Sequence, residues 1–172
     1  MQNYTINNLI QTNFQPLDFF KSITATKNNI DNLAEFEALE PQKKQELLLN
    51  GIHLANRMQK LRDLINEIYK NKVGSDIAIV ISSAYRCDKL NKLVKSKSTS
   101  QHLKFQACDF SIPKLKEIGY KEVMKELKKA KFETDQMLME GSWIHYSCKL
   151  LGNRNMFGTY LLENGERVFR EI

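Results

Sequence analysis

Two of the three histidines in this chain stand among residues that could bind a metal ion. His102 lies in "SQHLKFQACDF", where Asp109 follows seven residues later, and His145 lies further along in "WIHYS". Neutral imidazole and carboxylate groups suit a catalytic zinc site, which takes three protein ligands and keeps one position open for water. His102, Asp109 and His145 are therefore candidate zinc ligands, although the spacing of His102 and Asp109 is a weak signal when taken alone.

Each of these residues also has an ordinary structural explanation. His145 could be a hydrogen-bonded core residue, Asp109 could cap a turn, and Arg86 in "SSAYR" could pair with an acidic neighbour. Trp143 could simply belong to the core. The third histidine, His53, has no carboxylate or thiol at ligand spacing around it, so we expect it to be structural or exposed.

The elements that would position the candidate ligands are strands and a long helix. Pro41 opens the pattern "PQKKQELLLNGIHLANRMQKLRDLINEIYKN", in which apolar residues recur at helical spacing. The stretches "GSDIAIVISSAYR" and "QACDFSI" are typical of strands, and residues 88–101 between them read as a polar loop. A second helix is predicted for "YKEVMKELKKAKF".

The last third of the chain predicts two hairpins. "DQMLME" and "WIHYS" would pair around residues 141–142, and "FGTYLLENGERVFR" would fold around its Asn-Gly turn. Helices combined with strands joined by hairpins predict an α+β fold, with a small, mostly antiparallel sheet packed with helices.

The length of 172 residues favours one domain, and a hydrophobic content of 42% is ordinary for a soluble globular protein. Residues 1–40 are polar and rich in Asn and Thr, so we predict an N-terminal arm packed on the body. Residues 41–172 would form a single domain. The three cysteines, Cys87, Cys108 and Cys148, include no C-x-x-C pair, which favours buried thiols over a disulfide framework.

The net charge of +6 favours polyanionic partners: nucleic acid, anionic wall polymers or membrane surfaces. We expect no nucleic-acid partner, because the chain lacks a helix-turn-helix signature, RNP-like aromatic residues and zinc-finger spacing. No apolar run reaches the roughly 18 residues needed to span a bilayer. The N-terminus lacks a basic start followed by a continuous apolar region, so we expect synthesis in the cytoplasm without a signal peptide. We expect a monomer.

Several stretches together resemble the M15 peptidases, the group of zinc D-Ala-D-Ala carboxypeptidases and L-alanyl-D-glutamate endopeptidases. The stretches are "SSAYR", "SQHLKFQACDF" and "DQMLMEGSWIHYS". The family motif of S-x-H, A-x-D and W-x-H is matched by Ser100, His102, Ala107, Asp109, Trp143 and His145. Over residues 75–150 the chain is similar to the short branch found in phage lysins and in phage or prophage tail proteins.

The resemblance implies a Hedgehog/D-Ala-D-Ala peptidase-like fold with Zn²⁺ bound on the sheet by His102, Asp109 and His145. It implies hydrolysis of peptidoglycan stem or cross-link peptides, at an amide next to a D-amino acid, by zinc-activated water. The protein would act at the cell wall or as part of a phage particle, with anionic wall polymers as further partners. Carboxypeptidase and endopeptidase action both stay open, as does a non-catalytic structural or wall-binding component of a phage or prophage that keeps the fold.

The resemblance also assigns residues around the metal. Arg86 matches the arginine that the family uses to hold the substrate or its developing oxyanion, a task that suits a permanently charged guanidinium. It would be both catalytic and substrate-binding. Ser100, Gln101 and Trp143 would bind substrate.

The general base is predicted from hairpin geometry. If residues 141–142 form a two-residue loop, Glu140 pairs with Trp143 and shares the sheet face of His145. Glu140 is therefore the predicted catalytic base, at a distance that suits a base acting on metal-bound water. Asp135, at the start of the same strand, is the alternative.

Two positions depart from the family pattern. Phe105 stands where the family usually has glycine, and Ala84 stands where glycine is commoner. A backbone turn with positive φ at position 105 would resist a bulky side chain. These departures could change the substrate groove or the path of the loop, but neither removes a predicted ligand.

Overall fold

The computed structural model describes residues 3–172 and shows a single six-stranded sheet packed with helices. The strands are β1 (Val80–Ser83), β2 (Ala107–Ser111), β3 (Gln136–Glu140), β4 (Trp143–Ser147), β5 (Met156–Glu163) and β6 (Glu166–Glu171). Their order across the sheet is β1-β2-β4-β3-β5-β6, and each neighbouring pair is antiparallel except β3 with β5. The predicted α+β class with a mostly antiparallel sheet is confirmed.

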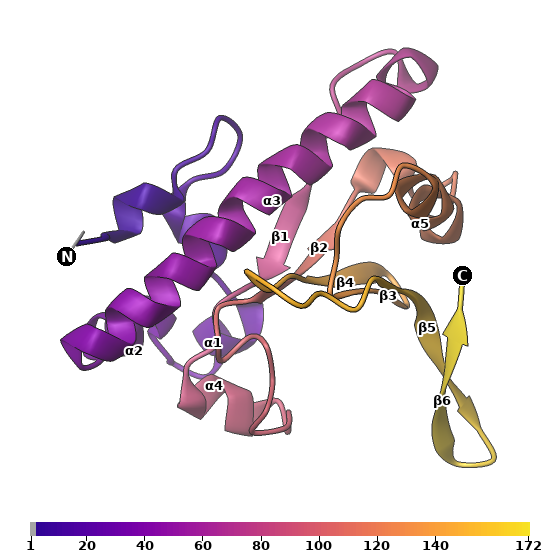
Figure 1. Cartoon of the computed structure of the whole chain (residues 1–172). Helices are drawn as coiled ribbons and strands as arrows, with labels where there is room; N and C mark the ends of the chain where they lie inside the picture. The colour runs from indigo at the N-terminus through magenta and orange to yellow at the C-terminus, as the bar shows by residue number, and fades with distance from the viewer. Residues whose placement is uncertain (1–2) are drawn as a thin grey trace.

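The helices lie around one end of this sheet. They are α1 (Ile23–Lys27), α2 (Asn32–Glu37), α3 (Pro41–Val73), α4 (Asp88–Leu93) and α5 (Tyr120–Lys129), with short 3₁₀ turns η1 (Ile6–Leu9), η2 (Pro16–Phe19) and η3 (Pro113–Leu115). The long helix α3 runs across β1 and β2, whereas the β5–β6 hairpin projects away from the body (Figure 1). Both predicted hairpins form, and the second turns through Asn164 and Gly165, which both have positive φ.

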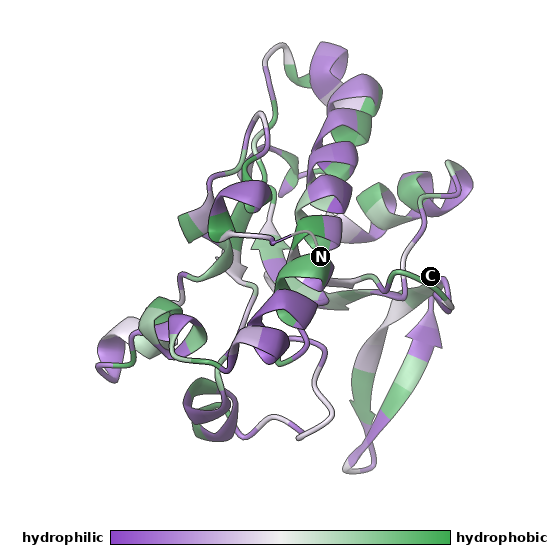
Figure 2. Ribbon diagram, turned by 60° about the vertical axis from the view of Figure 1, so that its left-hand side comes forward, coloured by the Kyte–Doolittle hydropathy of each residue, from purple (hydrophilic) through white to green (hydrophobic). Residues whose placement is uncertain are grey.

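Helix α3 begins at Pro41, as predicted, and ends at Val73, two residues beyond the predicted pattern. Pro41 occupies the first turn, where its missing N–H costs no hydrogen bond, and Gly74 follows the last turn with φ of 75°. The N–H of Gly74 donates to the Lys70 carbonyl at 2.8 Å. Apolar and polar residues alternate around the helix (Figure 2), and the apolar face is buried in the core. No helix of residues 3–172 is both long and apolar enough to cross a membrane.

The N-terminal segment packs into the same core as the rest of the chain. Leu9, Phe19 and Phe36 are fully buried. The side-chain amide of Asn32 donates to the Tyr85 carbonyl at 2.6 Å and accepts from the Cys87 N–H at 2.8 Å. The segment is thereby fastened to the loop after β1 that carries Arg86. The boundary at residue 40 stays a prediction, and residues 1–2 of the predicted arm lie outside the described residues.

The region predicted as a polar loop, residues 88–101, contains the short helix α4, so that prediction was wrong in part. Leu90 and Asn91 are buried on the inner side of this helix. The amide of Asn91 donates to the carbonyls of Ser96 and Lys97, which closes the following turn. The helix was missed because it has less than two turns and its many lysines give the sequence a polar pattern typical of a loop.

All three cysteines are free and buried, as predicted. Cys108 in β2 donates its thiol to the Met58 sulfur of α3 at 3.3 Å. Burial raises the pKa of both Cys108 and Cys148, so these thiols stay protonated and pack as small apolar groups.

Phe105 adopts the strained backbone that its position predicts. Its φ is +55°, in the left-handed region that disfavours residues with a side chain. The ring is fully buried, and its centroid lies 5.4 Å from that of Phe20, 5.4 Å from that of Tyr85 and 6.0 Å from that of Phe36. Burial of the ring in this aromatic cluster therefore offsets the backbone strain.

Gly51 in α3 makes room for this ring. A Cβ atom at Gly51 would lie 2.7 Å from Cε1 of Phe105, which is closer than carbon atoms pack. Replacing an ordinary helix glycine by alanine stabilises a protein by about 1 kcal/mol. For Gly51→Ala we expect the opposite, a loss of about 1–3 kcal/mol in the free energy of unfolding, because the added methyl group overpacks the core.

The measurement is urea unfolding of the wild type, Gly51→Ala, Phe105→Leu and the double variant. Phe105→Leu removes the ring edge that the added methyl group would meet, so the two changes should cost less together than their sum. A Gly51→Ala protein that is more stable than the wild type would contradict this account of the packing.

Candidate metal centre

The central strands bring two of the predicted ligands face to face. Asp109 in β2 pairs with His145 in β4 and, on its other side, with Ser83 in β1. Directly paired residues of an antiparallel sheet point to the same face, with Cβ atoms about 5 Å apart. The pairing therefore dictates that the Asp109 carboxylate and the His145 imidazole meet, and Nδ1 of His145 lies 2.8 Å from Oδ1 of Asp109.

His102 reaches the same carboxylate from the turn before β2. Its Nε2 lies 3.3 Å from Oδ1 of Asp109. Its Nδ1 lies 2.6 Å from the Ala84 carbonyl, which can only accept, so Nδ1 carries the proton and Nε2 presents a lone pair. The Arg86 N–H donates to the His102 carbonyl at 3.2 Å, which fixes the backbone of the turn.

The three side chains fit a single metal ion. One potential ligand atom from each of His102, Asp109 and His145 lies within 4.8 Å of the other two. Two imidazoles and one carboxylate form a donor set of the kind used by catalytic zinc sites. The hydrogen bond from His102 to a backbone carbonyl is the outer contact that commonly orients a metal-bound histidine. The structure thus brings together all three predicted ligands.

The protonation of these groups suits metal binding. Burial lowers the pKa of His102, although Asp109 opposes the effect, so the imidazole is neutral near pH 7. Burial disfavours ionisation of Asp109, but its contacts with the imidazoles of His102 and His145 outweigh this effect and hold the carboxyl pKa well below its usual value. Metal ligands must be deprotonated, and His102 and Asp109 meet that condition at neutral pH.

Arg86 contacts the metal centre through Asp109. Its Nη2 lies 2.5 Å from Oδ2 of Asp109, and its Nε donates to the Ser83 hydroxyl at 3.0 Å. Burial lowers the pKa of Arg86, while Asp109 and Glu140 raise it. The guanidinium therefore orients the Asp109 carboxylate, which is the acidic neighbour that the structural explanation of Arg86 expected but did not identify. Arg86 also lines the cavity of about 340 Å³ that contains the three candidate ligands.

Glu140 lies in that cavity too, and its register is the one predicted. Glu140 pairs with Trp143 and Leu138 pairs with His145, across a two-residue turn in which Gly141 has φ of 67°. Glu140 therefore shares the sheet face of His145, and both line the cavity together with Arg86. The only ion pair of Glu140 within residues 3–172 is with Arg167, whose Nη2 lies 3.8 Å from Oε1.

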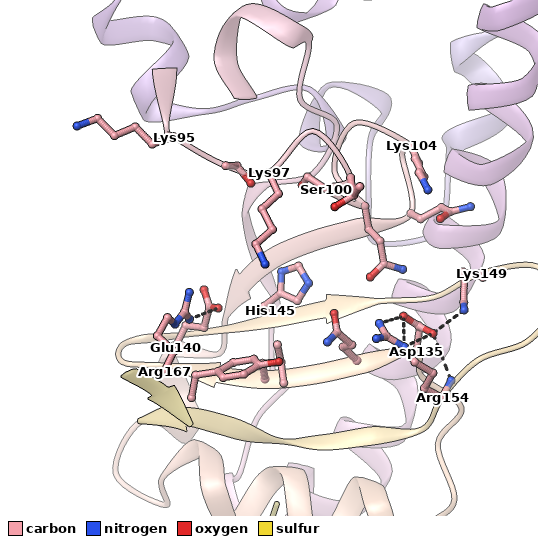
Figure 3. Close-up of a pocket in the computed structure, with 17 residues that line it drawn as sticks. Lys95, Lys97, Ser100, Lys104, Asp135, Glu140, His145, Lys149, Arg154 and Arg167 are labelled. Carbon is pink, nitrogen blue, oxygen red and sulfur yellow. Dashed lines mark hydrogen bonds and ion pairs between the residues drawn. The ribbon is translucent and has the colours of Figure 1, made fainter. Parts of the chain in front are cut away.

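A wider groove of about 800 Å³ continues from Glu140 and His145 along β3 to Asp135. Figure 3 shows its walls, with the 95–104 loop on one side and, on the other, Asp135 and the strands that carry Glu140 and Arg167. The candidate metal centre therefore stands at one end of a groove that follows β3 from Glu140 to Asp135.

Comparison with known protein families shows which family the chain belongs to. The family described as Peptidase M15 matches residues 13–147, well over half of the chain. The chain belongs to the M15 peptidase family. No curated protein and no solved structure matches it. Peptidases of this family are zinc-dependent, in agreement with the His102, Asp109 and His145 cluster. The match excludes residues 148–172, which contain the β5–β6 hairpin.

The remaining predicted site residues of this M15 peptidase lie around the metal centre. Ser100 accepts the His102 N–H through its hydroxyl at 3.3 Å and lines both the cavity and the groove. Gln101 lines the groove. Trp143 is 40% exposed, so it is not the simple core residue of the structural alternative. It lines a neighbouring hollow with Arg86 and Asp109. Substrate binding by Ser100, Gln101 and Trp143 stays a prediction.

Asp135, the alternative base, is held in a structural ion-pair cluster. Its side chain is 1% exposed, with Arg154 Nη2 at 2.5 Å and Lys149 Nζ at 2.9 Å. Burial disfavours its ionisation, but hydrogen bonds from Arg154 and Lys149 outweigh this and lower its pKa to about 2. A carboxylate this weakly basic and this firmly paired fastens the 149–155 segment to β3. The assignment of Glu140 as the base stays a prediction.

The Asp135 cluster predicts a pH-dependent loss of stability. The folded-state pKa of about 2 lies below the usual aspartate value of 3.8, so the ion pairs stabilise the fold above pH 4 and lose that effect as the pH falls toward 2. Asp135→Asn should lower the free energy of unfolding by about 2 kcal/mol at pH 7 and by roughly half of that at pH 3. Urea unfolding at the two pH values measures this, and a cost that does not change with pH would contradict it.

Proposed function

We propose that the protein is a zinc-dependent peptidase that hydrolyses peptidoglycan stem or cross-link peptides at an amide next to a D-amino acid. The observation that carries the proposal is the convergence of His102, Asp109 and His145 beside Glu140 at one end of an extended groove. Family membership supports peptide hydrolysis. The groove supports a peptide as the substrate, because an extended chain can lie along β3 with one amide beside the metal centre.

The chemistry divides between the metal and the side chains around it. Zinc held by the three ligands would lower the pKa of bound water toward about 7 and polarise the scissile carbonyl. Glu140 would accept the proton of the attacking water and return it to the leaving amine, because it shares the face of His145 and lines the same cavity. Arg86 would hold Asp109 in place and provide positive charge where the carbonyl oxygen becomes negative.

The groove favours endopeptidase over carboxypeptidase action. Carboxypeptidase action needs a closed pocket for a terminal carboxylate, whereas endopeptidase action needs room on both sides of the scissile amide. On one side the groove continues along β3 to Asp135, and on the other a hollow lined by Trp143 and Arg86 adjoins Asp109. We propose that the peptide crosses the metal centre between these two spaces. The site of action that we propose is the cell wall, with the protein acting there directly or as part of a phage particle.

Removing the base should abolish cleavage while leaving the fold and the metal centre intact. For Glu140→Gln we expect kcat to fall by about 10²- to 10⁴-fold, because the amide cannot accept the proton. Glu166→Gln is the matched control: Glu166 is exposed on the β5–β6 hairpin and forms no ion pair with any of residues 3–172. It should cleave at the wild-type rate.

The measurement is chromatographic product analysis of a synthetic stem peptide with L- and D-residues, incubated with each zinc-loaded protein. The identity of the products distinguishes removal of a terminal D-residue from internal cleavage. A wild type that binds zinc but leaves the peptide intact would contradict the peptidase proposal and would favour a non-catalytic component that keeps the fold.

A further inference from the structure

The walls of the groove beside the metal centre carry more positive than negative charge. Two of the lining side chains are carboxylates, Asp135 and Glu140, and six are cations: Lys95, Lys97, Lys104, Lys149, Arg154 and Arg167. The net charge of +6 favours polyanionic partners, but the sequence does not show where on the surface that charge lies. The structure places part of that charge on the predicted peptide path.

Not all of these cations are free to bind a ligand. Asp135 already binds Lys149 and Arg154 at 2.9 and 2.5 Å. Lys97 and Lys104 are exposed, and their ammonium groups form no ion pair or hydrogen bond with any of residues 3–172. In Figure 3 the side chain of Lys97 extends from its loop toward His145, whereas Lys95 points away. Lys97 and Lys104 are therefore the available cations of the loop wall.

Arg167 provides a cation from the opposite wall. It lies on β6, in the segment that the family match excludes. Its guanidinium lies over the Tyr160 ring, 5.0 Å from the centroid, and Nη2 is 3.8 Å from Glu140. The side chain is 68% exposed, so most of its five N–H donors face solvent in the groove. The hairpin thus adds to the groove a charge that the matched residues do not supply.

The groove also contains an uncharged hydrogen-bond donor, the side-chain amide of Gln101. Nε2 of Gln101 is buried and has no hydrogen-bond partner among the described residues, although Gln101 lines the groove. A buried amide without a partner is costly, and a carbonyl or carboxylate oxygen of a ligand would satisfy it. This unpaired donor is a second, independent sign that the groove binds an oxygen-rich ligand.

We propose that the groove selects an acidic peptide, with Lys97 and Lys104 binding substrate carboxylates from one wall and Arg167 binding them from the other. This inference rests on the proposed function, since it assigns the groove to the peptide that is cleaved. One exposed charge pair strengthens binding only about 1.5- to 5-fold. Three cations that face the same bound peptide together provide selectivity for acidic over neutral chains.

The test compares two forms of one stem-type pentapeptide that ends in two D-alanines. One form keeps its side-chain carboxylates, and the other has them converted to carboxamides. Calorimetric titration of the zinc-loaded wild type should give a Kd roughly tenfold lower for the acidic form at low salt. The preference should shrink as salt rises to about 0.5 M, because ions screen exposed charges.

The triple variant Lys97→Gln/Lys104→Gln/Arg167→Gln should bind both forms within about twofold of each other. Lys27→Gln/Lys116→Gln/Lys121→Gln is the matched control, because it also removes three positive charges, all three lysines are exposed and none lines the groove. It removes positive charge elsewhere and should keep the full preference. Equal binding of both peptides by the wild type would overturn the proposal, and so would an equal loss of preference in the control.

Cleavage of the acidic peptide is followed separately in the same samples. Carboxylate-dependent binding without cleavage would support the groove assignment while contradicting the proposed peptidase function. Cleavage without any preference for the acidic form would support the proposed peptidase function and contradict the groove assignment. The two proposals therefore fail in distinguishable ways.

Discussion

The antiparallel pairing of β2 with β4 is the constraint on which the metal centre depends. It sets Asp109 opposite His145 in the middle of the sheet, where β1 and β3 flank the pair. One oxygen of Asp109 then faces both histidines and the other faces Arg86. A slip of one residue in this pairing would turn the carboxylate to the opposite face and disperse the cluster. The buried positions on β2 and β4 oppose such a slip, because it would expose core side chains.

The third ligand depends on packing that begins far from the site. His102 is fixed by the Ala84 carbonyl and by the Arg86 N–H, and the backbone of Tyr85 between them accepts from Asn32 in α2. Three residues after His102, Phe105 takes a left-handed backbone that costs about 1–2 kcal/mol. Its buried ring offsets a cost of this size, because a fully buried side chain contributes about 1.5–3 kcal/mol. The N-terminal segment thus helps to position the metal centre.

Local patterns predicted much of the fold and of the site. The two hairpins and their turns follow from residue alternation and from Gly141 and the Asn-Gly pair, and the face of Glu140 followed from the same reasoning. The sequence marked position 105 as one where a positive φ would conflict with a bulky side chain, but it indicated neither that φ nor the aromatic rings from distant segments that offset the strain. Helix α4 was missed because only Leu90 and Asn91 are buried in it, and the lysines around them make the stretch look like a polar loop.

Local sequence patterns could not predict which distant segments contact one another. Arg154, which binds the Asp135 carboxylate, lies 19 residues further along the chain, in the loop between β4 and β5. Lys97 and Arg167 meet at one groove only because β5 joins the sheet beside β3, in the one parallel pairing among the described strands. The sequence could therefore identify the chemistry of the metal ligands, but not the charge that surrounds the substrate path.

The central claim is that His102, Asp109 and His145 hold one zinc ion beside Glu140, and metal content tests it most directly. The purified wild type, His102→Ala, His145→Ala and Glu140→Gln would each be incubated with zinc, dialysed and analysed by mass spectrometry. The account predicts about one zinc per chain in the wild type and in Glu140→Gln, and almost none in the two histidine variants. A wild type without zinc, or a His102→Ala protein that keeps it, would contradict the account.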